Sequence, residues 1–512
     1  MRRLLLLTLL LLPAVALLRA QAPQAPPQEP KLILFVAIDQ FRYDYLPRFR
    51  DEYKGGLKTL LDRGAVFANA HLEHYPSVTA VGHSTMMSGA TPAISGIIGN
   101  DWYDRETSKQ VTSVSDPLGK LLGAAGEASS PKRLLVSTIG DELKRSGSPD
   151  SKVIGISMKD RGAILPAGHM ADAAYWFDNA SGAFVSSDYY FPQTPAWVQA
   201  FNAAGHVKEY AGKTWVAGRT MPTEPGPKLN AAVYGSSYGN DLLESFAEDL
   251  IREEKLGQRG VTDVLTVGFS SNDSVGHTYG PDSPEAHAVS VGVDGSLGRL
   301  FAAVESAVGI ENVLVVLTAD HSVSPLPEVL ESQKMPGGRV LGDFFAPARA
   351  ALEAKYGPGN WIEATAGTSP YFNYKLMDEQ GVDRAEAEDI VAAVMREHPQ
   401  VARVYTRQQI LAGRAAYDAI DSRVLRSFNP QRSGDLEIVL NPFWIRSTSG
   451  TTHGSPYNYD THIPLIFMGP GIKPGRYYKA AALNDAAPTI AALLDIEMPS
   501  GSLGRILDEI IK

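Results

Sequence analysis

The chain has 512 residues, of which 44% are hydrophobic and 20% are charged, values that suit a large globular protein with an ample core. The formal net charge of -10 argues against a nucleic-acid-binding surface, so an anionic ligand must be attracted locally, by a metal or by a few placed cations. The sequence contains no cysteine, which excludes disulfides and a thiolate nucleophile and leaves His and carboxylate side chains as ligands for a zinc ion.

The N-terminus has the pattern of a secretory signal. Two Arg precede an apolar run from Leu4 to Leu12 that is too short to span a bilayer, and small residues follow at Ala20 and Ala22. We predict a signal peptide at residues 1–22, and hence a periplasmic or secreted protein without a membrane span after cleavage; an uncleaved anchor is the alternative. Residues 23–30 are rich in Pro, Gln and Ala and predict a disordered tether.

Residues 31–512 alternate between strand and helix patterns. Several short runs are apolar throughout, which predicts buried parallel strands. They are Leu32 to Ile38, Val153 to Ile156, Val261 to Phe269, Val313 to Thr318 and Ile463 to Met468. Helical patterns lie between them, for example at Asn240 to Glu254 and Pro284 to Val308. This alternation predicts an α/β fold, with a mostly parallel central sheet and helices on both faces.

Two insertions interrupt this alternation. The first, at about 104–236, is rich in Gly, Ser, Tyr and Trp. The second, at about 325–442, contains the segment Tyr371 to Leu376, a helix at Ala385 to Glu397 and the segment Leu436 to Leu440, which together predict a small α+β cap. Because the polar residues discussed below fall on both sides of each insertion, one catalytic domain fits better than two independent domains.

Polar residues follow several of the predicted strands. Asp39, Asp273, Asp320 and His321 each come shortly after an apolar run, and ligands bind at the carboxyl ends of the strands in a sheet of this kind. His277 would share a face with Asp273 if a helical turn forms there. Isolated pairs of this sort are commonly surface carboxylates or satisfied histidines, so the prediction depends on their convergence. Carboxylates and imidazoles without sulfur suit zinc in an open, catalytic site.

A candidate nucleophile lies in the segment H-Y-P-S-V-T-A-V-G-H, from His74 to His83. Pro76 ends an extended stretch, and we expect a helix to begin near Thr79, where free backbone N–H groups favour a bound phosphate. Judged from the residues alone, Ser77 and Thr79 are equally plausible nucleophiles, and either could instead cap the helix. His83 is interpreted as a structural residue or a neighbour of the ligands.

Two polar segments could hold a phosphate group. They are G-N-D at Gly99 to Asp101 and K-D-R at Lys159 to Arg161. Arg can bind two phosphate oxygens at once, and Lys offers a compact charge. A K-D-R run on its own is usually a solvated surface, but this one follows the apolar strand V-I-G-I-S. We expect both cations in an open cleft, with Asp160 beside the site or facing solvent.

Four motifs, taken jointly and in this order, resemble those of the alkaline phosphatase superfamily. They are F-V-A-I-D ending at Asp39, N-D-S-V-G-H-T-Y-G-P from Asn272 to Pro281, T-A-D-H from Thr318 to His321 and T-T-H-G-S from Thr451 to Ser455. More narrowly they resemble the type I phosphodiesterase and nucleotide pyrophosphatase branch and, within it, the phosphate-irrepressible periplasmic alkaline phosphatases of bacteria. The similarity runs from about Lys31 to the C-terminus and implies an alkaline phosphatase-like fold.

The resemblance also implies two zinc ions, each held by three side chains. The first set is Asp273, His277 and His453, and the second set is Asp39, Asp320 and His321. The resemblance favours Thr79 over Ser77 as the nucleophile, because its T-x-x-x-H spacing to His83 is similar to the nucleophile motif of the branch, and it implies that Thr79 coordinates zinc as well.

Three further residues match those that contact the phosphate oxygens in the monoesterase members: Asn100, Lys159 and Arg161. In that group the lysine stands in for a third metal ion, so the resemblance implies two metals rather than three.

The sequence therefore predicts a zinc-dependent alkaline phosphatase that hydrolyses small-molecule phosphate monoesters through a phosphothreonine intermediate on Thr79. The alternative is a phosphodiesterase or nucleotide pyrophosphatase with the same two-zinc site, against which Lys159 and Arg161 weigh. A sulfatase is disfavoured because its formylglycine usually derives from Cys. A non-catalytic phosphate- or zinc-binding protein is disfavoured because Thr79 is present. We expect no nucleic-acid partner and favour a monomer.

Overall fold

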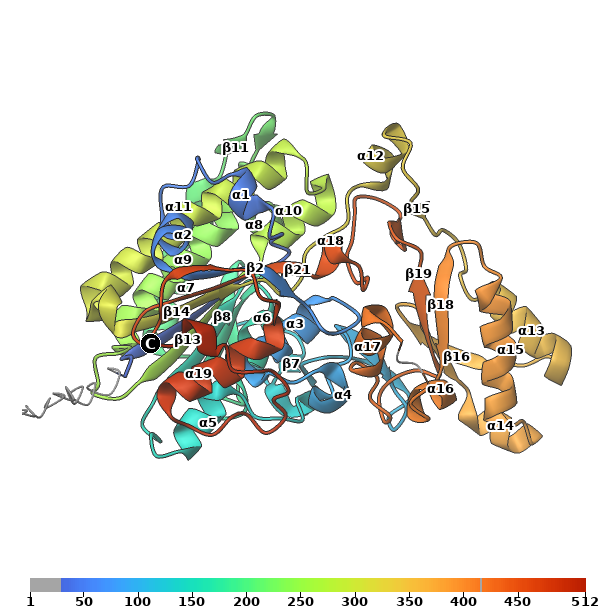
Figure 1. The fold of residues 1–512 in the computed structure, drawn as a ribbon. Helices are drawn as coiled ribbons and strands as arrows, with labels where there is room; N and C mark the ends of the chain where they lie inside the picture. Colours follow the sequence, from blue (N-terminus) through green and yellow to red (C-terminus); the bar gives the residue numbers. More distant parts are fainter. Residues whose placement is uncertain (1–28, 415–416) are drawn as a thin grey trace, which may run out of the picture.

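The structure is a computed structural model that describes residues 29–414 and 417–512 (Figure 1). The predicted signal peptide at 1–22 lies outside these residues, as does most of the predicted tether at 23–30. An 11-stranded sheet forms the centre, in the order β22-β2-β21-β14-β1-β13-β8-β9-β10-β6, with β23 beside β2. Its strands are β1 (Leu32–Ile38), β2 (Ala65–His71), β6 (Leu121–Leu122), β8 (Val153–Ser157), β9 (Ala173–Asp178), β10 (Ala183–Ser187), β13 (Asp263–Phe269), β14 (Val313–Thr318), β21 (His462–Met468), β22 (Gly475–Tyr477) and β23 (Ala481–Ala482).

The middle of this sheet is parallel. β1 pairs with β13 and β14 in parallel, and β8 pairs with β13 and β9 in parallel. Every residue of β1, β8, β13 and β14 is buried. Helices cover both faces of the sheet, so these strands have no solvent-facing side and their sequences do not alternate between apolar and polar residues. The predicted α/β fold with a mostly parallel sheet is therefore confirmed.

The prediction that the fifth apolar run is also a parallel strand is wrong. β21 runs antiparallel to both of its neighbours, β14 and β2. An apolar run shows that both faces of a strand are covered, but it carries no information on the strand's direction. As a result, the start of β21 at His462 lies at the same edge of the sheet as the carboxyl ends of β1, β13 and β14, and the loop before β21 reaches that edge too.

Helices cover both faces of the sheet, and in Figure 1 they lie above and below it. One layer contains α2 (Gly56–Arg63), α9 (Ser237–Glu254) and α11 (Pro284–Val308), of which α11 packs against both others. The opposite layer contains α3 (Thr79–Ser88), α5 (Ile139–Arg145), α6 (Asp160–Ala167) and α19 (Ala486–Leu494), with α3 in contact with the other three. Within the part of the chain that the structure describes, none of the helices has the length and apolar character needed to cross a membrane.

The remaining helices and strands around the central sheet are short. They are α1 (Tyr45–Arg48), α4 (Pro92–Ser95), β3 (Asp101–Asp104), β4 (Lys109–Thr112), β5 (Ser115–Asp116), β7 (Ala128–Ser129), α7 (Ala196–Ala204), β11 (Thr214–Val216), β12 (Arg219–Thr220), α8 (Pro227–Tyr234), α10 (Ser271–Tyr279) and α18 (Asn458–Thr461). We call the sheet together with all of these helices and strands the core.

A second lobe, which we call the cap, extends from α12 to β20 and lies to the right of the core in Figure 1. Its elements are α12 (Pro327–Ser332), β15 (Gly338–Arg339), α13 (Ala346–Tyr356), β16 (Ile362–Ala366), β17 (Ser369–Phe372), α14 (Tyr374–Gln380), α15 (Arg384–Arg396), β18 (Val401–Thr406), α16 (Arg407–Leu411), α17 (Ala419–Leu425), β19 (Leu436–Leu440) and β20 (Trp444–Ile445). The cap has a hydrophobic cluster of its own, which includes Phe344, Trp361 and Ile438.

Candidate metal centre and nucleophile

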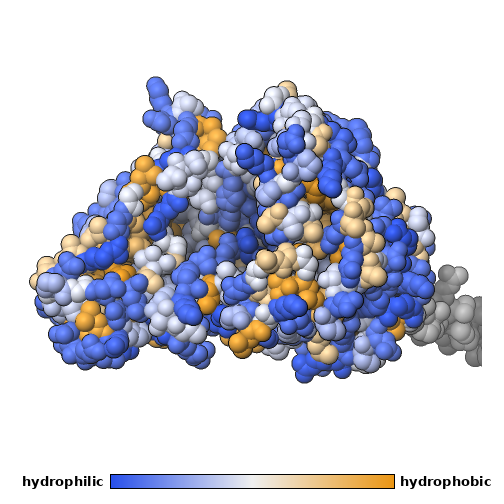
Figure 2. All heavy atoms as spheres, turned by 180° about the vertical axis from the view of Figure 1, so that it is seen from behind, coloured by the Kyte–Doolittle hydropathy of each residue, from blue (hydrophilic) through white to orange (hydrophobic). Residues whose placement is uncertain are grey.

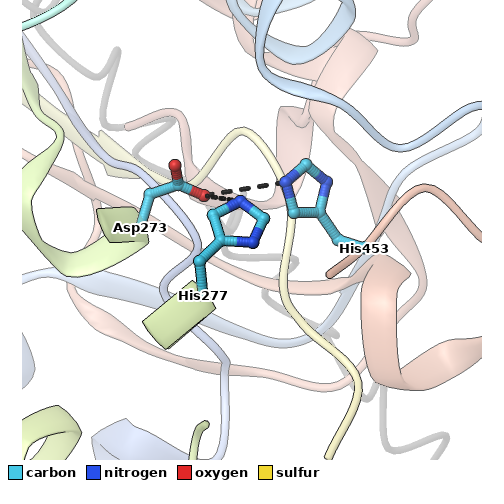
Figure 3. A group of neighbouring side chains, drawn as sticks. All are labelled: Asp273, His277 and His453. Carbon is cyan, nitrogen blue, oxygen red and sulfur yellow. Dashed lines mark ion pairs between the residues drawn. The ribbon is translucent and has the colours of Figure 1, made fainter. Parts of the chain in front are cut away.

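Asp273, His277 and His453 form the first of two groups that could hold a metal ion (Figure 3). Asp273 and His277 lie one helical turn apart on α10, shortly after β13, whereas His453 comes from the loop before β21. Asp273 Oδ1 lies 3.3 Å from His277 Nε2 and 3.6 Å from His453 Nε2. Both rings point toward the Asp273 carboxylate in Figure 3, so two nitrogens and one oxygen converge on one point.

Backbone carbonyls fix the orientation of three imidazoles in the site. The Nδ1 atom of each ring lies close to a carbonyl oxygen: His277 to Thr451 (2.8 Å), His453 to Ser77 (2.8 Å) and His321 to Ser322 (3.0 Å). A carbonyl oxygen only accepts hydrogen bonds, so each Nδ1 carries a hydrogen and donates it. Each neutral ring then presents the lone pair of Nε2 to the site, as a metal ligand does.

The second group joins the carboxyl ends of β1 and β14. Asp39, His83 and Asp320 have ligand atoms within 4.8 Å of one another. His321 Nε2 lies 3.1 Å from Asp320 Oδ2 and 4.0 Å from Asp273 Oδ1, which connects this group to the first. All four side chains of this group are fully buried. Among the described residues, Asp39 Oδ2 and Asp320 Oδ2 accept no hydrogen bond, as expected of buried carboxylates that face a cation.

His83 and His321 approach these carboxylates in different ways. His83 Nε2 lies 2.9 Å from Asp39 Oδ1, and within residues 29–414 and 417–512 its buried Nδ1 has no hydrogen-bond partner. His83 Nε2 therefore donates a hydrogen to Asp39, so this ring orients the carboxylate and presents no lone pair to it. His321, whose Nε2 is free to accept, has the geometry of a ligand.

Thr79 is the first residue of α3, so the prediction that a helix begins there is confirmed. Its Oγ1 lies 3.4 Å from His321 Nε2, and only 1% of the residue is exposed. The hydroxyl of Ser77, the other candidate nucleophile, donates a hydrogen bond to the carbonyl of Ser455 at 2.8 Å. The fold therefore directs Thr79 toward the metal groups and engages Ser77 elsewhere.

Lys159 lies between the two groups. Its Nζ is 2.6 Å from Asp273 Oδ2 and 3.1 Å from Asp39 Oδ2, and its side chain is only 9% exposed. The expectation that Lys159 lies in an open cleft is therefore wrong. Asp39 and Asp273 are buried, and without the ammonium between them their two charges would have no partner, which is strongly destabilising. The ammonium thus joins one carboxylate of each metal group.

The charges of these three residues shift one another's pKa in opposite directions. Burial alone would raise the pKa of Asp39 and Asp273, but the Lys159 ammonium, joined at Asp39 by the hydrogen bond from His83, holds both well below the usual range. Burial would lower the pKa of Lys159, and the carboxylates of Asp273 and Asp39 raise it instead. All three groups are therefore charged at neutral pH.

Asn100 and Arg161 lie near the helix that begins at Thr79. Asn100 Oδ1 accepts a hydrogen bond from the backbone N–H of Ala80 at 2.9 Å, in the first turn of α3. Arg161 lies in the first turn of α6, which packs against α3, and its side chain is 27% exposed. Asp160 accepts hydrogen bonds from the hydroxyl of Ser129 at 3.0 Å and from the backbone N–H of Arg161 at 2.7 Å, and its side chain is 30% exposed.

Sequence analysis missed Gln40, which lies in the site directly after Asp39. Gln40 Nε2 donates to Asp273 Oδ1 at 2.8 Å, and its backbone N–H donates to Asp320 Oδ1 at 3.0 Å. Its backbone has a φ of 61°, the left-handed region that few side chains adopt. A Cβ at Gly276 would approach Gln40 Oε1 to 1.7 Å, which explains the glycine in the N-D-S-V-G-H motif. The signal available in the sequence was that glycine, one residue before His277.

Comparisons with known proteins agree with this architecture. Alkaline phosphatase PafA of Elizabethkingia meningoseptica is 34% identical, over 97% of this chain and 97% of its own length. Alkaline phosphatase PhoV of Synechococcus elongatus is also 34% identical, over 94% of this chain and 93% of its own length. The crystal structure of PafA superposes with a TM-score of 0.89 and covers 94% of this chain and 99% of that one, which confirms the predicted alkaline phosphatase-like fold.

The family described as type I phosphodiesterase / nucleotide pyrophosphatase has a sequence model that matches residues 33–462, most of the chain. The predicted resemblance is thereby confirmed: the chain belongs to the type I phosphodiesterase / nucleotide pyrophosphatase family.

Proposed function

We propose that the protein is a zinc-dependent alkaline phosphatase that hydrolyses phosphate monoesters through a phosphothreonine intermediate on Thr79. The names of the relatives PafA and PhoV support the reaction, and the family description keeps a phosphodiesterase as the alternative. The observation that carries the choice is the position of Lys159, whose ammonium contacts a carboxylate of each metal group.

The metal assignment is supported by the Nε2 lone pairs that face the site and by Asp320 Oδ2, which accepts no hydrogen bond among the described residues. Asp273, His277 and His453 would hold the first zinc, and Asp39, Asp320 and His321 the second. Three carboxylate or imidazole ligands at each position, without sulfur, leave room for substrate, which suits catalytic zinc. His83 would orient Asp39 by its hydrogen bond rather than bind the ion.

The balance of charge favours a monoester. Asp39, Asp273 and Asp320 carry three negative charges and Lys159 one positive charge, and all four groups are buried or nearly so. Two divalent ions would leave these four groups with two positive charges, and Arg161 adds a third. This excess of positive charge favours the dianion of a monoester over the monoanion of a diester, and without Lys159 it would be smaller by one.

Thr79 Oγ1, which lies 3.4 Å from His321 Nε2, would attack the phosphorus of a monoester bound between the two groups, and water would cleave the resulting phosphothreonine in a second step. When bound, the zinc ions would lower the pKa of the attacking oxygens and stabilise charge on the leaving oxygen. Asn100, at the first turn of α3, and Arg161, in the first turn of α6, would hold the non-bridging oxygens of the transferred phosphoryl group.

Two further properties belong to this proposal. The basic and apolar pattern of residues 1–22 supports a cleaved signal peptide and a periplasmic or secreted enzyme. The ligands are small phosphate monoesters, and the enzyme acts as a monomer.

The test compares one monoester and one diester with the same leaving group, on protein whose metal content is known from elemental analysis. We expect two zinc ions per chain, loss of activity after exhaustive chelation, restoration by zinc, and a kcat/KM for the monoester well above that for the diester. A higher kcat/KM for the diester would favour the phosphodiesterase, and full activity without a transition metal would contradict the zinc mechanism.

A further inference from the structure

A cavity of about 530 Å³ lies between the core and the cap and opens beside the candidate metal centre. On the core side it is lined by Val78, Asn100 and His453, which belong to or adjoin the site. On the cap side it is lined by β17, β19 and β20, among them Trp444 and Glu437. The molecule seen from behind is hollowed between the two lobes (Figure 2).

The position of His453 relates this cavity to the reaction. Thr79 Oγ1 adjoins His321 of the second metal group, whereas His453 belongs to the first. In phosphoryl transfer the attacking and leaving oxygens lie roughly in line on opposite sides of the phosphorus. A leaving group that departs on the side of the first metal group therefore meets the cavity that His453 lines.

Two aromatic side chains form a fixed wall of the cavity. Trp444 and Tyr459 are each partly exposed and line it. A Cβ at Gly338 would lie 2.9 Å from the Trp444 ring, so this ring packs directly on backbone. Tyr459 stacks on Phe443 at 4.5 Å, and its hydroxyl accepts a hydrogen bond from the backbone N–H of Phe443 at 2.9 Å. Rings held in this way can bind a planar group without losing further freedom.

Glu437 provides a polar group in the same cavity. It is partly exposed, and its Oε1 accepts a hydrogen bond from the hydroxyl of Ser369 at 3.3 Å. Although part of the residue is exposed, burial of its carboxyl group raises the pKa of Glu437 to about 8, and the hydrogen bond from Ser369 opposes this only in part. Its carboxyl group is therefore uncharged at neutral pH and can both donate and accept a hydrogen bond.

We propose that this cavity is the leaving-group subsite of the enzyme and that Trp444 and Glu437 make it select monoesters of uncharged aromatic alcohols that carry a hydrogen-bonding group. The proposal rests on the phosphatase function proposed above and names its substrate class. The Trp444 and Tyr459 rings contact the aromatic ring of the leaving group, and the Glu437 carboxyl pairs with its polar substituent.

The charged residues that line the cavity agree with an uncharged leaving group. Asp101 lines it on the core side and is exposed, so a second anionic group there would meet a carboxylate. Arg446 lines it on the cap side, where its guanidinium donates to the backbone carbonyl of Gly367 and lies 5.1 Å from the centre of the Phe344 ring. These contacts hold the guanidinium against the cap.

The experiment uses the zinc-loaded full-length enzyme and three monoesters: ethyl phosphate, phenyl phosphate and 4-(hydroxymethyl)phenyl phosphate. The readouts are two ratios of kcat/KM, phenyl to ethyl and hydroxymethylphenyl to phenyl, each compared between variant and wild type. Intrinsic differences in leaving-group reactivity cancel in that comparison, and so does a reduced fraction of folded enzyme.

Trp444→Leu should lower the phenyl-to-ethyl ratio about 10-fold, since it removes the ring contact. Glu437→Leu should lower the hydroxymethylphenyl-to-phenyl ratio about 5-fold and leave the phenyl-to-ethyl ratio nearly unchanged. Glu397→Leu makes the same substitution at an exposed position at the end of α15, outside the cavity, and should change neither ratio.

The proposal is overturned if Trp444→Leu leaves the phenyl-to-ethyl ratio unchanged, or if Glu397→Leu alters the ratios as much as Glu437→Leu does. Failure of the proposed function gives a different result, because the wild-type enzyme would then cleave none of the three monoesters.

Discussion

Buried carboxylates on the core side and on the cap side of the cavity are in opposite states. In the core, Asp39 and Asp273 have a lowered pKa because the Lys159 ammonium lies beside both. In the cap, burial raises the pKa of Glu437 to about 8, and a serine hydroxyl is its hydrogen-bond partner. The same chemical group would thus be a charged metal ligand on one side and an uncharged hydrogen-bonding group on the other, and the presence of a neighbouring cation decides which.

This difference assigns different tasks to the two sides. The core side, with its charges and its nucleophile, would carry the reaction on every substrate. The cap side, with rings and an uncharged acid, would affect only the choice of leaving group. Changes on the core side should therefore reduce activity on all monoesters, and changes on the cap side should alter ratios between them.

The largest effect is expected for Thr79→Ala, which removes the attacking hydroxyl and should lower turnover at least about 1000-fold while the zinc content stays at two per chain. Thr79→Ser keeps a hydroxyl and should retain part of the activity. Ser77→Ala is the matched control two residues away, because the Ser77 hydroxyl is bonded to the Ser455 carbonyl. Phosphate trapped on Ser77 in an acid-quenched reaction would refute the assignment.

His321→Ala and His83→Ala should separate a ligand from a residue that orients one. Both rings are fully buried and both lie near Asp320, so the two variants lose similar packing. We expect His321→Ala to lose about one zinc per chain and nearly all activity. His83→Ala should keep both ions with about a 10- to 100-fold lower affinity or activity, the usual cost of losing a residue that orients a ligand. Equal zinc loss in both would show that His83 is itself a ligand.

The double variant Lys159→Ala, Arg161→Ala tests the selection of monoesters on the core side. Removing charge-assisted donors from a desolvated site typically costs roughly 2 to 4 kcal/mol, or about 30- to 1000-fold in rate. The kcat/KM for a monoester should fall by at least that range. The kcat/KM for a diester should fall far less, because its second ester group replaces one of the charged oxygens that the cations would contact.

Lys159 is also the ion-pair partner of Asp39 and Asp273. In molecules without bound zinc, its loss therefore leaves both carboxylates without a cation. The comparison is therefore made at matched zinc occupancy. If monoester and diester fall by the same factor, Lys159 and Arg161 do not select between them.

The smallest effect is expected on the cap side, in the pH dependence of stability. Glu437 has an ordinary pKa of 4.5 when unfolded and about 8 when folded, so the folded protein binds one more proton between these values. Its contribution to stability is full below pH 4.5 and is lost as the pH rises toward 8, by at most about 1.4 kcal/mol per pH unit.

Glu437→Gln should remove this slope, so its denaturation midpoint should fall less than that of the wild type between pH 5 and pH 8. Glu397→Gln at the exposed end of α15 should behave as the wild type does. Parallel curves for Glu437→Gln and the wild type would show that the Glu437 carboxyl is already ionised when the protein is folded.

The framework of the fold was accessible from the sequence because it depends on local pattern. Apolar runs without alternation marked β1, β13 and β14, and α11 was predicted with the bounds that the structure has. The strand ends brought Asp39, Asp273 and Asp320 to one edge, since parallel strands that are neighbours end together. Each of these features can be predicted from the residues immediately before and after it in the sequence.

Other features depend on contacts between segments that are distant in the sequence, so no local sequence pattern predicts them. The direction of β21 is set by its partners β14 and β2. The burial of Lys159 is set by two carboxylates from β1 and α10. The role of His83 is inferred from its Nδ1, which has no hydrogen-bond partner among the described residues. Only the packed structure shows this.

Because β21 enters the sheet antiparallel, His453 reaches Asp273 and His277 from a segment near the C-terminus. The first metal group is therefore incomplete until β21 has paired with β14 and β2. An ion that needs all three of these ligands would bind only after this long-range pairing has formed, so its uptake would report that the sheet is assembled.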